Sequence, residues 1–347
     1  MTSPIQQDRS QTLRRAAVRA TLAPSIHNTQ PWRFVLSADA LEIHADRSRQ
    51  LQVLDLQGRQ MTISCGCALF NARASMAAAG YDPAVERRPD PMQPDLLARV
   101  LVGEPWRGRV PIGALDEQAE GRHTNRRRFC DEPVPPADVA ALVEAADKEG
   151  AVLFPVERDD HRASTARLSQ LADAIENADP AYRAELRAWT TDDGRRRDGV
   201  PAAAVPHTDA GSGDEIPIRD FDTRGMGWLP TQTQSSMKQC LLLLGSAADD
   251  QVAWLRSGEA LERVLLEVTR RGYVASPFTQ VIEVARTNAM LRQELALTMY
   301  PHILLRVGRA PATAATRRRR LVDMIAEVSE QTFSPRPTAD RVGGDAG

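Results

Sequence analysis

The stretch Pro24-Ser25-Ile26-His27-Asn28-Thr29-Gln30-Pro31-Trp32 is the most informative part of this chain. It is a polar loop framed by prolines, and it runs directly into the strand-like segment Arg33-Phe34-Val35-Leu36. Much later, residues 122–128 read Arg-His-Thr-Asn-Arg-Arg-Arg, a dense cluster of hydrogen-bond donors suited to cradle a phosphate. A ligand with a flat, polar-edged part and an anionic tail would need both segments.

The chain also contains an internal repeat. Gly66-Cys67-Ala68-Leu69 is followed by Gly80-Tyr81, and Gly258-Glu259-Ala260-Leu261 is followed at the same spacing by Gly272-Tyr273. Helical segments lie between these landmarks, and extended apolar runs follow them. Landmarks that recur in the same order indicate two related halves. We therefore predict a first half over residues 1–110 and a second half over 111–311.

The second half is longer than the first because of an insertion at about residues 160–233. Its first part, 160–188, has a charged amphipathic helix pattern, and its second part is rich in Gly, Pro and Asp with scattered apolar anchors. Long segments of this kind are often lids or binding loops, so we predict a lid-like insertion. Beyond it, residues 312–347 predict a short helix carrying Arg317–Arg320 and a flexible tail. We interpret that arginine run as a solvated helix face rather than a nucleic-acid patch.

Hydrophobic periodicity predicts an α+β fold. The predicted helices are Gln11–Leu22, Met61–Ala79, Ala137–Glu149, Arg162–Asn177, Val252–Arg271 and Thr279–Arg292. The predicted strands are Trp32–Leu36, Leu41–Ala45, Leu97–Val102, Val152–Val156, Cys240–Leu244 and His302–Val307, the first two joined as a hairpin.

Composition sets outer bounds on function. The chain has 347 residues and four cysteines. Its net charge of −2 gives no general attraction to nucleic acid or to an anionic membrane. The first ten residues lack an apolar signal region, and no run is long enough for a membrane helix, so we expect a cytoplasmic protein. Cys65 and Cys67 are too closely spaced for common zinc sites. We read them as buried small residues in preference to a reactive thiolate, and we predict no metal.

The segment Ala23–Trp32 resembles the flavin-contacting loop of nitroreductase-fold flavoproteins. The whole chain resembles the Acg family, nitroreductase-like proteins with two fused, divergent halves, over roughly residues 13–311. The supporting matches are Ser64-Cys65-Gly66 with Ala68-Leu69, Arg122 with Thr124-Asn125-Arg126-Arg127, Gly258-Glu259-Ala260, and Leu304-Leu305-Arg306-Val307-Gly308.

This resemblance implies a nitroreductase-like fold in which two divergent halves mimic a nitroreductase homodimer and bind FMN between them. The cofactor-binding residues it implies are Pro24, Ser25, Asn28, Gln30, Trp32, Arg122, Thr124, Arg126, Ser276, Arg306 and Arg309. Trp32 is equally compatible with ordinary core packing, and the arginine cluster by itself with a solvated loop. The repeat-related second site, which would use Arg14, Arg15 and Arg19, has no matching loop near residues 147–156, so we expect one FMN per chain.

The implied function is NAD(P)H-dependent reduction of nitro or quinone-type electrophiles by hydride transfer through flavin N5. The alternative is a flavin-sequestering or stress-related binding protein whose lid covers the FMN and leaves little reductase activity. No side chain is assigned a catalytic role. The expected partners are FMN and a small electrophile, without nucleic acid or membrane, in a monomer or a homodimer.

Overall fold

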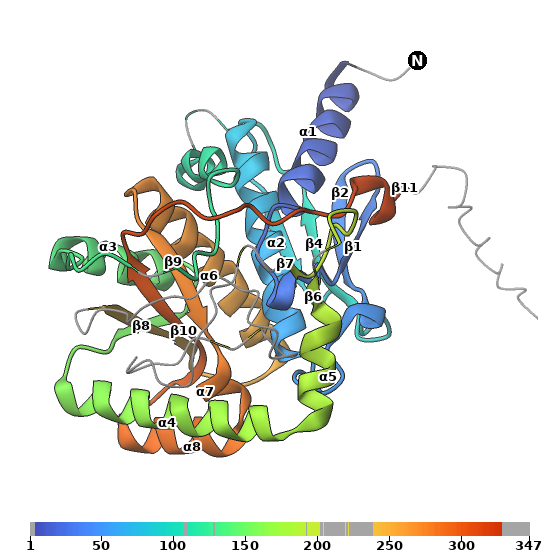
Figure 1. The fold of residues 1–347 in the computed structure, drawn as a ribbon. Coiled ribbons are helices and arrows are strands. Elements are labelled where there is room, and N and C mark those ends of the chain that lie inside the picture. Colours follow the sequence, from blue (N-terminus) through green and yellow to red (C-terminus); the bar gives the residue numbers. More distant parts are fainter. Residues whose placement is uncertain are drawn as a thin grey trace, which may run out of the picture.

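The computed structural model describes residues 4–106, 108, 110–127, 129–191, 193–201, 204, 219, 221 and 239–327. In this part of the chain two β-sheets lie on either side of a central pair of long helices (Figure 1). Helices and sheets alternate irregularly along the sequence, which confirms the predicted α+β class. No helix in the described part is long and apolar enough to cross a membrane.

The first half supplies four strands of a five-stranded sheet and the helices packed on it. Its elements are α1 (Pro4–Ala20), β1 (Trp32–Leu36), β2 (Ala40–Ala45), α2 (Arg59–Ala78), β3 (Ala84–Arg87) and β4 (Leu96–Leu101), and the 3-10 helix Pro111–Gln118 follows at the start of the second half. Strands β1 and β2 form the predicted hairpin, with Leu36 opposite Leu41. Trp32, Phe34 and Leu36 alternate into the core, as expected for a strand with one buried face.

The second half supplies a second sheet and the helices packed on it. Its elements are α3 (Pro136–Asp147), β5 (Val152–Pro155), β8 (Cys240–Ser246), α6 (Gln251–Arg270), β9 (Val274–Phe278), α7 (Gln280–Glu283), α8 (Ala285–Glu294) and β10 (Tyr300–Gly308). The sheet order is β5-β8-β10-β9, all antiparallel. Strands β8 and β10 are apolar and almost wholly buried, because helices or loops cover both faces of this sheet.

The repeated glycines meet where α2 and α6 cross. A Cβ on Gly66 would lie 2.9 Å from the Cα of Gly258 and 2.1 Å from the carbonyl oxygen of Leu255. A Cβ on Gly258 would lie 2.0 Å from the carbonyl oxygen of Ile63. Only glycine at both positions permits this backbone approach. The two glycines that the sequence pattern pairs therefore lie on either side of one helix crossing.

The insertion begins with two helices where the sequence pattern predicts one. Helix α4 (Asp159–Ala178) ends before Pro180, and α5 (Pro180–Trp189) begins there, with the Asp179 side chain accepting a hydrogen bond from the Ala181 N–H at 2.8 Å. Proline is favoured in the first turn of a helix but not in its interior, so the break has a local cause. Strands β6 (Thr190–Thr191) and β7 (Val200–Pro201) follow. Of the predicted apolar anchors Phe221 is described, and Ile216, Ile218 and Trp228 lie outside the described residues.

The predicted C-terminal helix is wrong. Residues 309–320 form an extended strap, followed by the 3-10 turn Leu321–Asp323 and strand β11 (Ile325–Glu327). The strap leaves the second half and crosses to the first, where β11 pairs in parallel with β1 (Figure 1). The Arg319 N–H donates to the Gln30 side chain at 2.7 Å, a tertiary bond that replaces the helical one. The predicted flexible tail beyond Glu327 lies outside the described residues.

A two-part pocket between the halves

Residues 25–30 form a tight loop with unusual backbone angles. His27, Asn28 and Gln30 have φ values of 45°, 54° and 50°, which side chains other than glycine adopt at a cost. The loop is held by the Ser25 hydroxyl, which accepts from the Gln30 N–H at 2.9 Å, and by the Ser64 hydroxyl, which accepts from the Ile26 N–H at 3.2 Å. The strained loop is therefore fixed against the start of α2.

The donor cluster at 122–127 is positioned by the edge of the second sheet. The Asn125 N–H donates to the Ala275 carbonyl of β9 at 2.9 Å, and the Asn125 amide donates to the Pro311 carbonyl at 2.8 Å. Thr124 forms an isolated parallel bridge with Ala275. These contacts bring Thr124 and Arg126 next to the Pro24–His27 loop of the first half.

A largely apolar cavity of about 90 Å³ lies where the loop, α2, α6 and the second sheet meet. We call it the ring pocket; it is lined by Pro24, Ser25, Ile26, His27, Gln60, Ile63, Ser64, Cys67, Thr124, Arg126, Arg219, Phe221, Leu261, Leu265, Pro277, Thr279, Ile303 and Leu305. The cavity is smaller than the roughly 300–1,000 Å³ usual for small-molecule sites. Two of its walls, Arg219 and the 3% exposed Phe221, come from the insertion.

Polar atoms without partners are buried in this pocket. Among the described residues, no partner is found for either ring nitrogen of His27 or for the Gln60 amide nitrogen. Buried polar groups in native proteins are nearly always hydrogen-bonded. Burial, together with Arg219 and Arg126, holds the pKa of His27 well below its usual value. A neutral imidazole and an amide thus remain to meet the polar edge of a ligand.

A second, cationic hollow adjoins the ring pocket and shares Pro24, Ser25, Thr124 and Arg126 with it. We call it the anion pocket; its other lining residues are Asn28, Arg122, His123, Val200, Ala314, Thr316 and Arg318. Arg318, from the strap, donates to Asn28 Oδ1 at 3.1 Å and to the Thr316 hydroxyl at 2.7 Å. The Leu22 carbonyl accepts from both Arg122 and Arg318 at 3.2 Å.

The anion pocket holds more positive charge than its protein neighbours neutralise. Burial and the nearby Arg219 lower the pKa of Arg126 to about 10, and burial and Arg122 lower that of Arg318 to about 9. In the part of the chain that the structure describes, no carboxylate forms an ion pair with Arg126, whose guanidinium lies 5.5 Å from the Phe221 ring centre. Desolvated guanidinium groups gain most from an anion that binds between them.

The structure brings some predicted site residues together and separates others. Pro24, Ser25, Thr124 and Arg126 line both pockets, while Asn28 and Arg122 line the anion pocket. The remaining predicted residues line neither pocket: Gln30, Trp32, Ser276, Arg306 and Arg309.

Each of these five has another described position. Trp32 is fully buried in the core, and Ser276 lies on β9 opposite Arg306. Arg306 lies with its guanidinium 4.1 Å from the Phe129 ring centre. Arg309 forms an ion pair with Glu132 at 3.4 Å. The order of motifs in the sequence does not show that these residues lie outside the two pockets.

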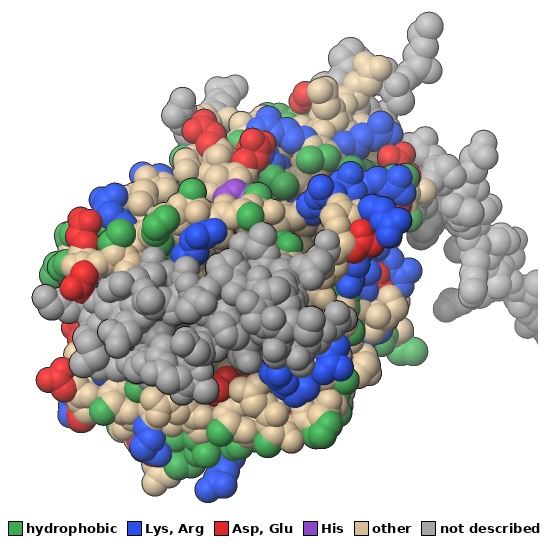
Figure 2. Space-filling view, viewed as in Figure 1, with side chains coloured by type: hydrophobic (Ala, Val, Ile, Leu, Met, Phe, Trp, Pro, Cys, Tyr) green, Lys and Arg blue, Asp and Glu red, His purple; other side chains and the backbone are tan. Residues whose placement is uncertain are grey.

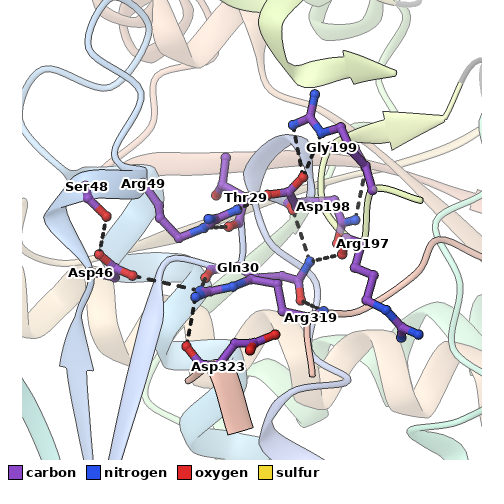
Figure 3. A network of polar contacts seen from close by, with 12 residues as sticks. Thr29, Gln30, Asp46, Ser48, Arg49, Arg197, Asp198, Gly199, Arg319 and Asp323 are labelled. Carbon is purple, nitrogen blue, oxygen red and sulfur yellow. Dashed lines mark hydrogen bonds and ion pairs between the residues drawn. The ribbon is translucent and has the colours of Figure 1, made fainter. Parts of the chain in front are cut away.

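Gln30 belongs to a polar network that ties three distant segments together (Figure 3). Its amide donates to the Arg197 carbonyl of the insertion at 2.8 Å, and its side-chain oxygen accepts from the Arg319 N–H of the strap. Asp198, next to Arg197, pairs with Arg49 of the first half. The polar loop is thus the place where the insertion, the strap and the first half contact one another.

Several pocket residues were missed by sequence reasoning. His27 was given no role, and Gln60, Cys67, Arg219, Phe221 and Arg318 were not proposed. The arginine run containing Arg318 was visible in the sequence, but nothing local indicated that the strap returns to the first half.

The repeat-related position on the other side of the helix pair is filled by ion pairs. The repeat places Glu259 where the ring pocket has Cys67. Glu259, 0% exposed, pairs with Arg73 at 2.7 Å and with Arg87 at 2.7 Å. Glu149 adds bonds to Arg73 and Arg263 at 2.7 and 2.6 Å. These paired side chains take up the space and the charge that a second ligand would use.

The arginines predicted for a second site are also neutralised. Arg15 pairs with Asp116 at 2.8 Å, and Arg19 pairs with Asp116 at 3.2 Å and with Glu120 at 2.5 Å. Asp116 is buried, so this is a closed arrangement rather than an open donor set.

A larger cavity, of about 440 Å³, lies elsewhere, between residues 53–59 and α8. Its lining mixes Arg59 and Arg292 with Asp55, Asp249 and Glu283. Two arginines against three acidic residues give no preference for an anion, and none of the predicted site residues lines this cavity. Size alone therefore does not make it the functional site. Figure 2 likewise shows acidic and basic side chains mixed over the visible face.

Comparison with known proteins shows relatives that cover most of the chain. "Putative NAD(P)H nitroreductase Rv3131" of Mycobacterium tuberculosis is 34% identical over 306 residues, covering 88% of this chain and 87% of the relative. "Putative NAD(P)H nitroreductase acg" of the same organism is 30% identical over 307 residues, covering 86% and 89%. No family model matches the chain.

Solved structures give weaker similarity. The FMN- and NADPH-dependent nitroreductase NfnB from Sphigopyxis aligns with a TM-score of 0.39 and 17% identity, over 63% of this chain and 99% of that one. A nitroreductase with bound FMN from Bacteroides fragilis aligns with a TM-score of 0.36 and 12% identity, over 64% and 97%.

Proposed function

We propose a function for this chain from the premise that it belongs to the nitroreductase-like family that includes Rv3131 and acg of Mycobacterium tuberculosis. It is an FMN-binding oxidoreductase that takes electrons from NAD(P)H and reduces small electrophiles of nitro or quinone type. One observation supports this most. The ring pocket, which is largely apolar and contains polar atoms without partners among the described residues, adjoins the anion pocket, which is lined by three arginines.

The chemical types of the residues that line the two pockets fit FMN. The ring pocket offers apolar walls from Ile63, Leu261 and Leu265, and polar groups at His27 and Gln60. The anion pocket offers Arg122, Arg126 and Arg318 to a phosphate monoester, which carries close to two negative charges near pH 7. The size of the ring pocket requires Phe221 and Arg219 to shift when a tricyclic ring enters.

FMN, when bound, would supply hydride acceptance and delivery at its N5 atom. The chain's own residues would bind, orient and shield it. The three arginines would fix the phosphate end, which sets the depth of the ring in the pocket. His27, kept neutral by burial and by its two arginine neighbours, would offer one donor and one acceptor instead of a second cation. Phe221 and the leucines of α6 would exclude water from the ring.

A second candidate function is favoured by the insertion. Arg219 and Phe221 line the ring pocket and are 8% and 3% exposed. Arg219 is held by Glu283 at 2.6 Å and by a bond to Tyr182 of α5. A nicotinamide has to stack on the flavin within about 3.5 Å for hydride transfer. If these side chains move aside for FMN and then close over the bound ring, the nicotinamide is kept away, and the protein stores flavin and turns over slowly.

One experiment separates the two functions. The purified chain is loaded with FMN and mixed anaerobically with NADPH or NADH, and flavin bleaching is followed by stopped-flow absorbance. Bleaching by a nicotinamide supports the oxidoreductase. Bleaching by dithionite alone supports the storage protein, and failure to bind FMN after reconstitution refutes both. The nitroreductase-dimer-like fusion of the halves, a cytoplasmic location and the monomeric or dimeric state remain predictions.

A further inference from the structure

A buried carboxylate lies behind the anion pocket. Glu262 is on α6, is 0% exposed, and has its Oε1 atom 3.5 Å from Arg122 Nε. Neither of its oxygens has a well-formed hydrogen bond to a described residue, although Asn71 contributes a polar contact that lowers its pKa. A carboxylate is rarely buried without a charged partner. Glu262 does not line either pocket, so it acts through Arg122.

Glu262 changes the charge that the anion pocket presents. Arg122, Arg126 and Arg318 each carry a positive charge, and the carboxylate of Glu262 offsets one of them, which leaves a net charge of two. Burial raises the pKa of Glu262 to about 6 against the opposing effects of Arg122, Asn71 and Arg318, so the carboxyl group is mostly ionised at neutral pH.

We propose that Glu262 is a positioning residue that holds Arg122 for the anion and adjusts the pocket to a dianion by taking up a proton when that anion binds. This inference rests on the phosphate-binding part of the proposed function. An incoming dianion takes over the arginines that stabilise the ionised carboxylate, and it brings negative charge close to a buried negative group. Protonation of Glu262 relieves that repulsion.

The groups that face Glu262 and the anion pocket come from every neighbouring segment. Arg122 and His123 come from the donor cluster, Asn71 and Cys67 from α2, and Arg318 from the strap. His123 is a second titratable group beside the anion pocket, and burial together with Arg122 and Arg318 lowers its pKa. Its effect must be separated from that of Glu262.

Sulfate is a suitable probe because it remains a dianion throughout the pH range that matters. Sulfate binding to the flavin-free chain is measured by titration calorimetry at pH 7 in two buffers of different ionisation enthalpy, which gives the protons taken up. Wild type should take up a fraction of a proton, and Glu262→Gln should take up less than half as much. His123→Asn should retain most of the uptake. Sulfate affinity of wild type should rise as pH falls from 8 to 5.

The affinity of Glu262→Gln should depend on pH less than that of wild type and be roughly tenfold tighter at pH 8, because one buried negative charge is gone. Glu267→Gln, on the same helix but outside the pocket, is the matched control. Uptake in Glu262→Gln of at least half the wild-type value, or uptake that disappears in His123→Asn, overturns the proposal. If Glu262→Gln does not fold, an absence of proton uptake in wild type overturns it. An absence of any sulfate binding refutes the phosphate site itself.

Discussion

Arg126 is the side chain whose surroundings say most about the ligand, because it is desolvated and lies next to a second cation. Arg126→Ala should weaken FMN much more than riboflavin, since only FMN carries the phosphate. A lost charge-assisted bond costs about 1.5–3 kcal/mol, roughly a tenfold to hundredfold loss of affinity. Fluorescence titration of both ligands measures the difference. Arg309→Ala, outside the pocket, is the control, and an equal loss for both ligands would show that Arg126 acts through folding.

His302 should set part of the acid stability. It is fully buried on β10, its Nε2 lies 2.7 Å from the Ser246 hydroxyl, and burial followed by Arg59 lowers its pKa to about 4. The unfolded chain, with a pKa near 6.5, then binds the proton more readily. Stability is therefore lost as pH falls from 6.5 towards 4, by up to roughly 3 kcal/mol. Urea unfolding at several pH values should show a flatter acid limb in His302→Asn than in wild type. His161→Asn should keep the wild-type slope.

Single residues of the site were partly predictable. The family resemblance implies Ser25, Thr124 and Arg126 as site residues, and the structure places all three around both pockets. Arg306 and Arg309 are implied by the same resemblance, yet one stacks on Phe129 and the other pairs with Glu132. The charge of an arginine in the sequence does not show whether the fold places a carboxylate or an aromatic ring beside it. Arg318 carries no signal beyond its charge, because its place depends on the path of the strap.

At the scale of elements, the crossing of α2 and α6 is where an added side-chain atom should destabilise the protein most. Gly258→Ala would place a methyl group 2.0 Å from the Ile63 carbonyl oxygen, so the helices would have to separate. We expect a loss of about 1–3 kcal/mol or more, measured by chemical unfolding. Gly194→Ala, whose added Cβ would meet nothing within 4 Å, should be close to neutral. Wild-type stability in Gly258→Ala would contradict the close crossing.

The elements that sequence reasoning found are those with strong local patterns. Strand β1 has the predicted bounds, and α2 and α6 agree within a few residues. Strands β3, β9 and β11 were missed. They are short, and β3 and β11 lie at sheet edges, where pairing with a distant strand decides the conformation more than the residues do. The strap follows the same rule, because its arginines bond to Gln30, Asn28 and Leu22 instead of to their own helix.

At the scale of the whole molecule, the asymmetry of the two halves predicts one FMN per chain. One side of the helix pair has a pocket, and the other has the buried ion pairs of Glu259 and Glu149. Heat release of the flavin and quantitation against protein should give a ratio near one after full reconstitution. Glu259→Gln should not add a second site, because Arg73 and Arg87 still fill the space. A ratio near two in wild type would refute this prediction.

The pairing of β11 with β1 determines when the first sheet can be completed during synthesis. Phe34 lies opposite Ile325, so the partner of the first strand is among the last described residues to leave the ribosome. At about 5–20 residues per second the nascent chain waits on the order of tens of seconds for it. During that wait β1 is an open edge, and open edges invite mispairing. Arg318 is also made late, so the complete anion pocket forms only after residue 318 has been synthesised.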